Sequence, residues 1–268
     1  MSLEITSHIG VFDSGVGGLS VLRELRRELP TAALTYVADS AHAPYGERTD
    51  AYVTDRSRAV TRHLLASGAQ LIVVACNTAT AIAINRLRDE WPDVPFVGVE
   101  PGLKPASASS RSGRIGVLAT PGTLASERFH RLLAGQPQGV TIVAQPCPGL
   151  AGLIEQIDLT DLRIADAIET FCAPLRQADV DTVVLGCTHY AFVSDRIQAA
   201  MGRTVDIVDT AQAVARQTAR IAASLQTLSD PQDRGATRLH TTGDLAAFQR
   251  VTAGLWPQPS GQQATSIR

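Results

Sequence analysis

The chain has 268 residues, of which 44% are hydrophobic, and its formal net charge is −2. This length allows one large domain or two domains of about 100–150 residues each. The balanced charge and the lack of a basic run indicate no nucleic acid and no anionic membrane among its partners.

No stretch of about 18 apolar residues is present, and the N-terminus has no apolar signal core. We therefore expect a cytoplasmic protein without membrane contact. In that compartment the four cysteines, which show no CxxC spacing, are expected to be thiols rather than disulfides.

Short apolar strands and amphipathic helices alternate in the first half of the chain, a pattern typical of α/β proteins. Leu22, Leu25 and Leu29 give the first helix an apolar stripe at helical spacing. Thr49 is placed to cap the next helix. The expected elements are a strand at 8–12, a helix at 19–29, a strand at 34–38, a turn-rich loop at 39–48, a helix to 66, a strand from 71, a helix at 79–91 and a strand at 94–99.

The same alternation continues in the second half. Serines dominate residues 107–112, which we expect to form a loop or crossover. The tail at 257–268 is rich in Gln, Pro, Ser and Gly and is predicted to be disordered. The expected elements are strands from 114, at 140–145, from 182 and at 205–208, helices at 162–175 and 211–225, a polar break at 229–235, a strand at 238–242 and a helix at 245–254.

Two strand-and-turn segments occur twice. Residues 71–78 resemble residues 182–189, and residues 9–14 resemble residues 115–120. The two pairs are separated by similar lengths of chain, which indicates one domain plan used twice. Buried parallel strands are apolar throughout, and open α/β sheets bind ligands at the carboxyl ends of their strands.

Cys76 and Cys187 occupy matching positions in the first repeated pair of segments. A lone cysteine is more often a small buried core residue than a reactive one. Here both precede residues suited to capping a helix, and a helix N-terminus lowers the pKa of a thiol. A matched pair of thiols therefore indicates chemistry on two faces of one substrate atom. Cys172, on an apolar helical stripe, is interpreted as core, and Cys147, between two prolines, as a loop residue.

Polar residues near the strand ends have structural and functional interpretations. Asp13 could cap the following helix, hold a substrate ammonium group or relay a proton with a nearby thiol. The glycines after it are interpreted as letting the backbone approach a small ligand. His189 could be bonded within its turn or could set the protonation of Cys187. On physical grounds alone Glu155 is interpreted as a solvated helix residue, and the turn at 43–46 as ordinary or as a substrate contact.

The composition gives no support for a metal or a pyridoxal phosphate cofactor. The six histidines show no HExxH or other close ligand grouping. A pyridoxal enzyme needs a lysine for its Schiff base. The single lysine, Lys104, has no glycine- or serine-rich phosphate cup beside it.

Several motifs, in their order along the chain, resemble the aspartate/glutamate racemase family and, within it, the glutamate racemases. They span about residues 9–248. One departure is Ala191, which stands where the family usually has proline. The motifs are FDSGVGGLSV at 12–21, APYGER at 43–48, ACNTA at 75–79, LATPGT at 118–123, LGCTHY at 185–190 and TGD at 242–244.

The resemblance implies a cofactor-independent racemase that interconverts L- and D-glutamate for peptidoglycan precursors. It also implies two similar flavodoxin-like α/β domains with mainly parallel sheets, related by a pseudo-twofold axis, with the substrate between them. The first domain is expected to be discontinuous, at 1–98 plus 209–268, and the second to cover 99–208. A homodimer is an ordinary assembly in the family.

The family's acid/base pair corresponds to Cys76 and Cys187. The resemblance implies that Cys76 serves D-glutamate with help from Asp13, and that Cys187 serves L-glutamate with help from His189 and Glu155. The expected substrate contacts are Asp13, Ser14, Pro44, Tyr45, Gly46, Asn77, Thr78, Thr123, Thr188 and His189.

Three alternatives stay open. An aspartate or hydantoin racemase is the nearest, although the Asp-Ser-Gly-Val-Gly-Gly segment favours glutamate. An arylmalonate-type decarboxylase protonates one face and needs one cysteine, so the matched pair disfavours it. A noncatalytic amino-acid-binding protein needs no paired thiols at all.

Overall fold

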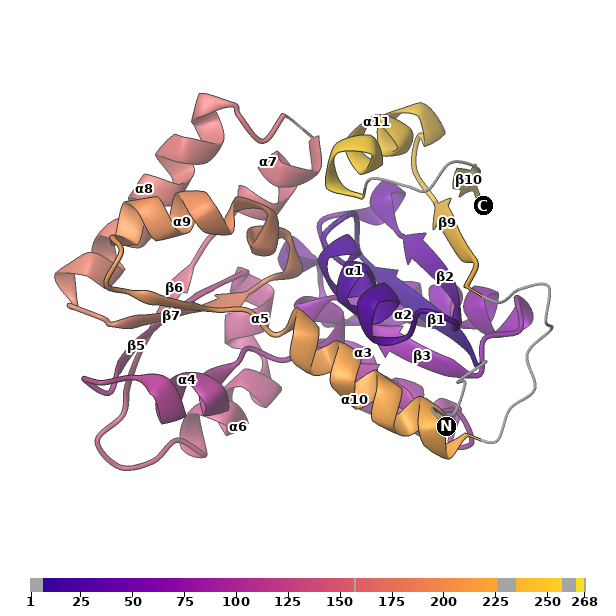
Figure 1. Ribbon diagram of the computed structural model, residues 1–268, viewed down its shortest axis with the longest axis horizontal. Helices are drawn as coiled ribbons and strands as arrows, with labels where there is room; N and C mark the ends of the chain where they lie inside the picture. Colours follow the sequence, from indigo (N-terminus) through magenta and orange to yellow (C-terminus); the bar gives the residue numbers. More distant parts are fainter. Residues whose placement is uncertain (1–6, 157, 226–234, 257–263, 268) are drawn as a thin grey trace.

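The computed structural model describes residues 7–156, 158–225, 235–256 and 264–267. The chain forms two lobes, each built around a parallel sheet with helices against it (Figure 1). Among the described residues, no helix is both long enough and apolar enough to cross a membrane. The predicted polar break at 229–235 lies outside this part of the chain except for Gly235.

The first sheet has the strand order β10-β9-β2-β1-β3-β4, and all its pairings are parallel. Because β9 pairs beside β2, the C-terminal segment returns to the sheet that the N-terminal strands form. Its strands are β1 (His8–Asp13), β2 (Ala33–Ala38), β3 (Leu71–Val74), β4 (Phe96–Gly98), β9 (Thr237–Thr241) and β10 (Ala264–Ser266).

The second sheet has the order β6-β5-β7-β8 and is also parallel. Counted from the first strand of each lobe, the order 2-1-3-4 occurs in both sheets, as in flavodoxin-like folds. β5 therefore corresponds to β1, and β7 to β3, which are the pairs that resemble each other in sequence. This confirms the predicted fold class, while the residue bounds of the domains stay a prediction. The strands are β5 (Arg114–Ala119), β6 (Thr141–Pro146), β7 (Thr182–Gly186) and β8 (Asp206–Val208).

Helices bury both faces of each sheet. In β1, Val11 packs in a core cluster with residues of α1 and α10, while Phe12 packs on the other face with α2 and α3. Burial on both faces explains why these strands are apolar throughout. The helices around the first sheet are α1 (Leu19–Glu28), α2 (Asp50–Ala66), α3 (Asn77–Glu90), α10 (Ala211–Ser224) and α11 (Leu245–Leu255).

The second lobe is covered in the same way. Leu118 packs with α8 and α9, and its neighbour Val117 packs with α4 and α6 on the other face. The helices of this lobe are α4 (Leu103–Ser109), α5 (Pro121–Ala125), α6 (Glu127–Ala134), α7 (Leu150–Gln156), α8 (Leu162–Gln177) and α9 (Ser194–Met201).

Two expected loops contain more structure than predicted. Part of the serine-rich segment 107–112 is helical, because α4 extends to Ser109 and buries Leu103 and Ala106 in the core. The loop at 39–48 contains two 3₁₀ turns, η1 (Ser40–His42) and η2 (Tyr45–Glu47). The predicted cap of α2 is confirmed, since the Thr49 hydroxyl accepts a hydrogen bond from the Tyr52 amide at 3.3 Å.

The tail corrects one prediction. Residues 257–263 lie outside the described part of the chain, but the prediction of disorder is wrong for residues 264–266, which form β10. The edge of β9 offers backbone groups for pairing. β10 pairs with them in parallel, and the Ile267 amide donates to the Thr241 carbonyl at 2.8 Å.

Candidate active site

Residues that follow β1, β3, β5 and β7 line one small cavity, called here the inner cavity. The site lies where the strand order reverses in both sheets, between β1 and β3 and between β5 and β7. Of the predicted site residues only Thr123 and Glu155 are not in its lining, and each bonds to a lining residue. The lining consists of Asp13, Ser14, Pro44, Tyr45, Gly46, Cys76, Asn77, Thr78, Thr120, Ala151, Cys187, Thr188 and His189.

Cys76 is the N-cap residue of α3, and the cap is its own sulfur rather than Asn77 or Thr78. Its Sγ accepts a hydrogen bond from the Ala79 amide at 3.4 Å and lies 3.8 Å from the Ser14 Oγ. Burial, and then the negative charge of Asp13, raise the pKa of this thiol well above its ordinary value. The expectation that the helix start would favour the thiolate is therefore wrong for Cys76, because burial outweighs the helix amide.

Asp13 ends β1 and is fully buried. It does not cap α1, whose N-cap residue is Gly18. Its Oδ1 accepts from the Ser14 amide at 2.6 Å and the Ser14 hydroxyl at 3.2 Å, and its Oδ2 accepts from the Thr188 hydroxyl at 2.9 Å. Burial raises the pKa of Asp13. The carboxyl group thus connects the neighbourhood of Cys76 with the strand end that carries Cys187.

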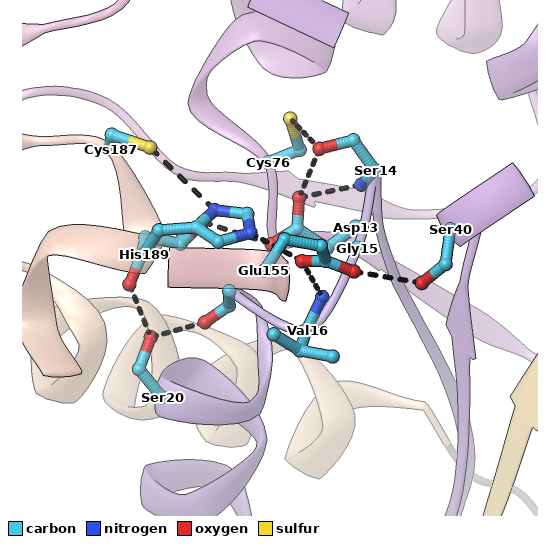
Figure 2. Close-up of polar contacts among 12 residues, drawn as sticks. Asp13, Ser14, Gly15, Val16, Ser20, Ser40, Cys76, Glu155, Cys187 and His189 are labelled. Carbon is cyan, nitrogen blue, oxygen red and sulfur yellow. Dashed lines mark hydrogen bonds and ion pairs between the residues drawn. The ribbon is translucent and has the colours of Figure 1, made fainter. Parts of the chain in front are cut away.

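Cys187 has different neighbours (Figure 2). It precedes the 3₁₀ turn η3 (Thr188–Val193) and makes no capping bond with its side chain. Its Sγ lies 3.8 Å from His189 Nδ1, and His189 Nε2 lies 2.8 Å from Glu155 Oε2. Burial disfavours the imidazolium, but the bonds to Cys187 and Glu155 outweigh it and raise the pKa of His189 well above its ordinary value.

Glu155 is not the solvated helix residue that its sequence context indicated. Its side chain is 12% exposed. Besides His189, it accepts hydrogen bonds from the Val16 amide at 2.8 Å and the Ser40 hydroxyl at 2.9 Å. Burial alone would raise the pKa of Glu155, but these bonds, that of His189 first, lower it. Glu155 is therefore held as the carboxylate partner of His189.

The glycine-rich turn after β1 lies against this pair. A Cβ atom on Gly17 would lie 2.3 Å from His189 Nδ1, and one on Gly15 would lie 2.2 Å from Glu155 Oε2. The glycines therefore allow the turn of the first lobe to approach side chains of the second lobe, rather than a ligand as the sequence suggested.

The hydroxyl groups of Thr78 and Thr120 and the amide of Asn77 belong to residues that also line the inner cavity. The Oγ1 atoms of Thr78, Thr120 and Thr123 lie 3.0–3.2 Å from one another. The Nδ2 atom of Asn77 is buried and has no hydrogen-bond partner. A buried donor without a partner is costly, so an acceptor on a bound ligand would stabilise this arrangement.

The other two cysteines lie in the core of the second lobe. Cys172 is fully buried among residues of α8 and β7, which confirms its interpretation as core, and Cys147 belongs to the same cluster. Within the described ranges, no group of three or more His, Cys, Asp or Glu side chains could hold a metal ion.

A model of the Asp/Glu/Hydantoin racemase family matches residues 9–218. The chain belongs to this family. The match begins in β1 and ends in α10, and it confirms the resemblance that the motifs predicted.

Within this racemase family the chain is similar to several glutamate racemases. It is 46% identical over 256 residues to the glutamate racemase of Ectopseudomonas mendocina, covering 96% of this chain and 95% of the relative. Its structure is similar to that of glutamate racemase isoform RacE1 from Bacillus anthracis, with a TM-score of 0.83, 30% identity and coverage of 97% and 96%. Escherichia coli glutamate racemase, solved with L-glutamate and the activator UDP-MurNAc-ala, gives a TM-score of 0.84 at 29% identity, with 97% of both chains covered.

Several residues near the site of this racemase family member were not among those predicted from the sequence. Thr120 corresponds to Ser14 in the repeated segments, so the internal repeat could have identified it. Asp39 and Ser40 directly follow β2, so their place at the carboxyl edge of the first sheet follows from the strand assignment. Ala151 lines the cavity from α7 without any motif that could have indicated it.

Proposed function

We propose that the protein interconverts L- and D-glutamate with two thiols. One thiolate removes the proton from Cα on one face, and the other thiol returns a proton to the opposite face. Because the substrate does not rotate in the site between the two steps, the two sulfurs have to approach Cα from opposite sides.

The observation that carries this proposal is the pairing of Cys76 and Cys187 in one cavity. They follow corresponding strands, β3 and β7, of two sheets with the same strand order, and both line the inner cavity. A duplicated fold that brings its matching strand ends together presents equivalent groups to both sides of a bound ligand. Neither a one-sided lyase nor a binding protein needs this arrangement.

We assign the roles of the two thiols from their neighbours. The raised pKa of Cys76 keeps its proton in place at neutral pH, so Cys76 is the acid of the resting site. His189, supported by Glu155, can accept the proton of Cys187 and leave a thiolate. This resting state is ready for L-glutamate, with Cys187 as the base, and the reverse protonation state is ready for D-glutamate.

The carbanion formed at Cα places negative charge on the substrate carboxylate, which needs hydrogen-bond donors. We propose that the Asn77 amide and the Thr78 hydroxyl, supported by Thr120 and Thr123, supply them. Ser14, Pro44, Tyr45, Gly46 and Thr188 complete the contacts, and Asp13 assists Cys76 through Ser14.

Further features are proposed on the basis of the family resemblance. The product D-glutamate supplies peptidoglycan synthesis in the cytoplasm, the protein acts as a homodimer, and the lobes correspond to domains 1–98 plus 209–268 and 99–208. No cofactor takes part. Lys104 is exposed on α4 and does not line the inner cavity, so it could not hold pyridoxal phosphate there through a Schiff base.

Chiral chromatography of L-glutamate incubated with the purified protein and EDTA, without added cofactor, tests the proposal. We expect D-glutamate to accumulate until the two enantiomers are equal, and we expect the Cys76→Ala variant to form none. L-Aspartate in a parallel reaction tests the substrate class. Absence of D-glutamate with the wild-type protein, or activity only without EDTA, would contradict the proposal.

A further inference from the structure

A loop of the first lobe closes one side of the inner cavity. This closing loop, residues 43–48, carries the lining residues Tyr45 and Gly46. It packs closely against the second lobe, since a Cβ atom on Gly46 would lie 2.6 Å from Thr120 Cβ. The Glu47 carboxylate also accepts a hydrogen bond from the Gly149 amide at 3.1 Å. The position of this loop therefore decides how tightly the cavity is enclosed.

The loop is tied to the first lobe through Asp39, a fully buried residue that the proposed chemistry does not use. Its carboxylate accepts hydrogen bonds from the Tyr45 hydroxyl, from Arg56 Nε at 3.0 Å and from Arg56 Nη2 at 2.9 Å. The Thr242 hydroxyl donates a further bond at 2.9 Å. Charge-assisted bonds of this kind are stronger than neutral ones, and the bidentate arginine adds geometric precision.

Thr242 belongs to the TGD motif, which has no part in the proposed chemistry. Its hydroxyl also accepts a hydrogen bond from the Ala41 amide at 3.2 Å. A Cβ atom on Gly243 would lie 3.1 Å from Ser40 Cβ. The segment after β9 therefore supports the turn that contains Asp39, which gives the return of the C-terminal segment to the first sheet a role in the site.

The Tyr45 hydroxyl is occupied by Asp39 and is not offered to a ligand. Its ring is buried in the same core cluster as Cys76. Burial and the charge of Asp39 raise the pKa of Tyr45, so its hydroxyl stays a donor. Tyr45 thus lines the cavity and uses its hydroxyl as a tether.

We propose that Asp39 is a positioning residue: held by Arg56 and Thr242, it fixes Tyr45 and thereby keeps the closing loop seated against Thr120 of the other lobe. The proposal rests on the function proposed above, because the loop is assigned there to substrate binding. Loss of the tether loosens the loop, weakens substrate binding and lets reagents reach the two thiols, without removing a group from the chemistry.

The test uses Tyr45→Phe, Asp39→Asn, the double variant and Thr242→Val. We expect Tyr45→Phe and Asp39→Asn each to raise the KM for L-glutamate about tenfold, the order expected for one hydrogen bond to a charged group, with a much smaller change in kcat. We expect the double variant to be no worse than the more affected single variant, since both substitutions break the same tether. Thr242→Val should raise KM in the same direction.

Arg58→Gln is the matched control. Arg58 also lies on α2 and also bonds a carboxylate through its guanidinium, that of Glu90, but neither residue lines the inner cavity. We expect its KM to equal that of the wild type. A KM unchanged in Tyr45→Phe, or single effects that multiply in the double variant, would overturn the proposal.

A second readout does not depend on activity. Iodoacetamide alkylation, followed by peptide mapping, measures the access to each thiol. We expect Tyr45→Phe to speed alkylation of Cys76 and Cys187 about tenfold relative to Cys172, because the loop loosens while the core stays packed. Equal acceleration at all three sites would instead show general destabilisation and contradict a positioning role.

If the wild type fails to racemise glutamate, the proposed function fails, and the alkylation ratio still decides the role of Asp39. If Asp39→Asn does not fold, Tyr45→Phe and Thr242→Val decide it.

Discussion

The two half-sites have the same framework but different neighbours. Cys76 and Cys187 follow corresponding strands of two sheets with one strand order. Beside Cys76 lie a hydroxyl and a buried carboxyl group, those of Ser14 and Asp13, whereas Cys187 lies beside the imidazole of His189. The duplicated fold thus sets where the thiols are, and the residues around them make the two half-sites chemically different.

This difference suits a reaction that needs an acid and a base at the same time. Two identical half-sites would favour the same protonation state on both thiols. Burial and the charge of Asp13 raise the pKa of Cys76. Cys187 instead has an imidazole as its neighbour, with 3.8 Å between its Sγ and His189 Nδ1. The asymmetry fits this requirement, and substitutions in each half-site test whether it matters for the reaction.

Among substitutions that keep both thiols, the largest expected effect comes from Gly17→Ala, which places a methyl group where His189 now lies. The added Cβ would lie 2.3 Å from His189 Nδ1, so the imidazole has to move away from Cys187. We expect kcat to fall by about 10²–10⁴-fold, the usual contribution of acid–base assistance. Gly254→Ala, whose Cβ would meet nothing within 4 Å, is the control and should keep full activity. Equal kcat values for the two variants would show that the position of His189 does not matter.

Asp13→Asn and His189→Asn should weaken opposite half-sites, each lowering kcat about 10²-fold. Because enantiomers have equal free energies, kcat/KM has to remain the same in both directions for every variant. The difference should therefore appear in the isotope effect on kcat/KM with α-deuterated substrate. We expect Asp13→Asn to enlarge it for D-glutamate and His189→Asn to enlarge it for L-glutamate. Enlargement for the same enantiomer in both variants would refute separate half-sites.

The pH profile should show the raised pKa of Cys76. This thiol has to carry its proton to act as the acid for L-glutamate, and its pKa in the folded protein lies well above its ordinary value. Activity is therefore kept as pH rises past about 8.5, the ordinary pKa of cysteine, and is lost only at the raised value. In Asp13→Asn the alkaline limb of kcat/KM should move to lower pH, because a negative charge is removed. A wild-type decline centred near pH 8.5 would contradict a raised pKa for Cys76.

The smallest effect is expected for Cys172→Ala, a substitution outside both half-sites. Cys172 is fully buried in the core of the second lobe, and shortening a buried side chain costs on the order of 1 kcal/mol. We expect a lower melting temperature in calorimetry with kcat within about twofold of the wild type. A normal melting temperature combined with greatly reduced turnover would give Cys172 a role in the site.

The sequence predicted the framework of the site better than its electrostatics. Apolar strands ending at cysteines predicted the fold and placed both thiols, because apolar runs and their repetition can be recognised directly in the sequence. Cys76 was expected to be activated by its helix, but the sequence did not reveal that its sulfur is buried beside Asp13. The role of Glu155 was also hidden from local reasoning, since its partners Val16, Ser40 and His189 lie far away in the chain.

In the proposed mechanism each thiol serves one face of Cα. Proton NMR in heavy water, following loss of the α-proton signal, tests it directly with Cys76→Ala and Cys187→Ala. Both variants should fail to racemise, because the return proton has no donor. We expect Cys76→Ala to exchange the α-proton of L-glutamate alone, and Cys187→Ala that of D-glutamate alone, slowly and with retention. Equal exchange of both enantiomers by either variant would contradict the two-thiol, two-face mechanism.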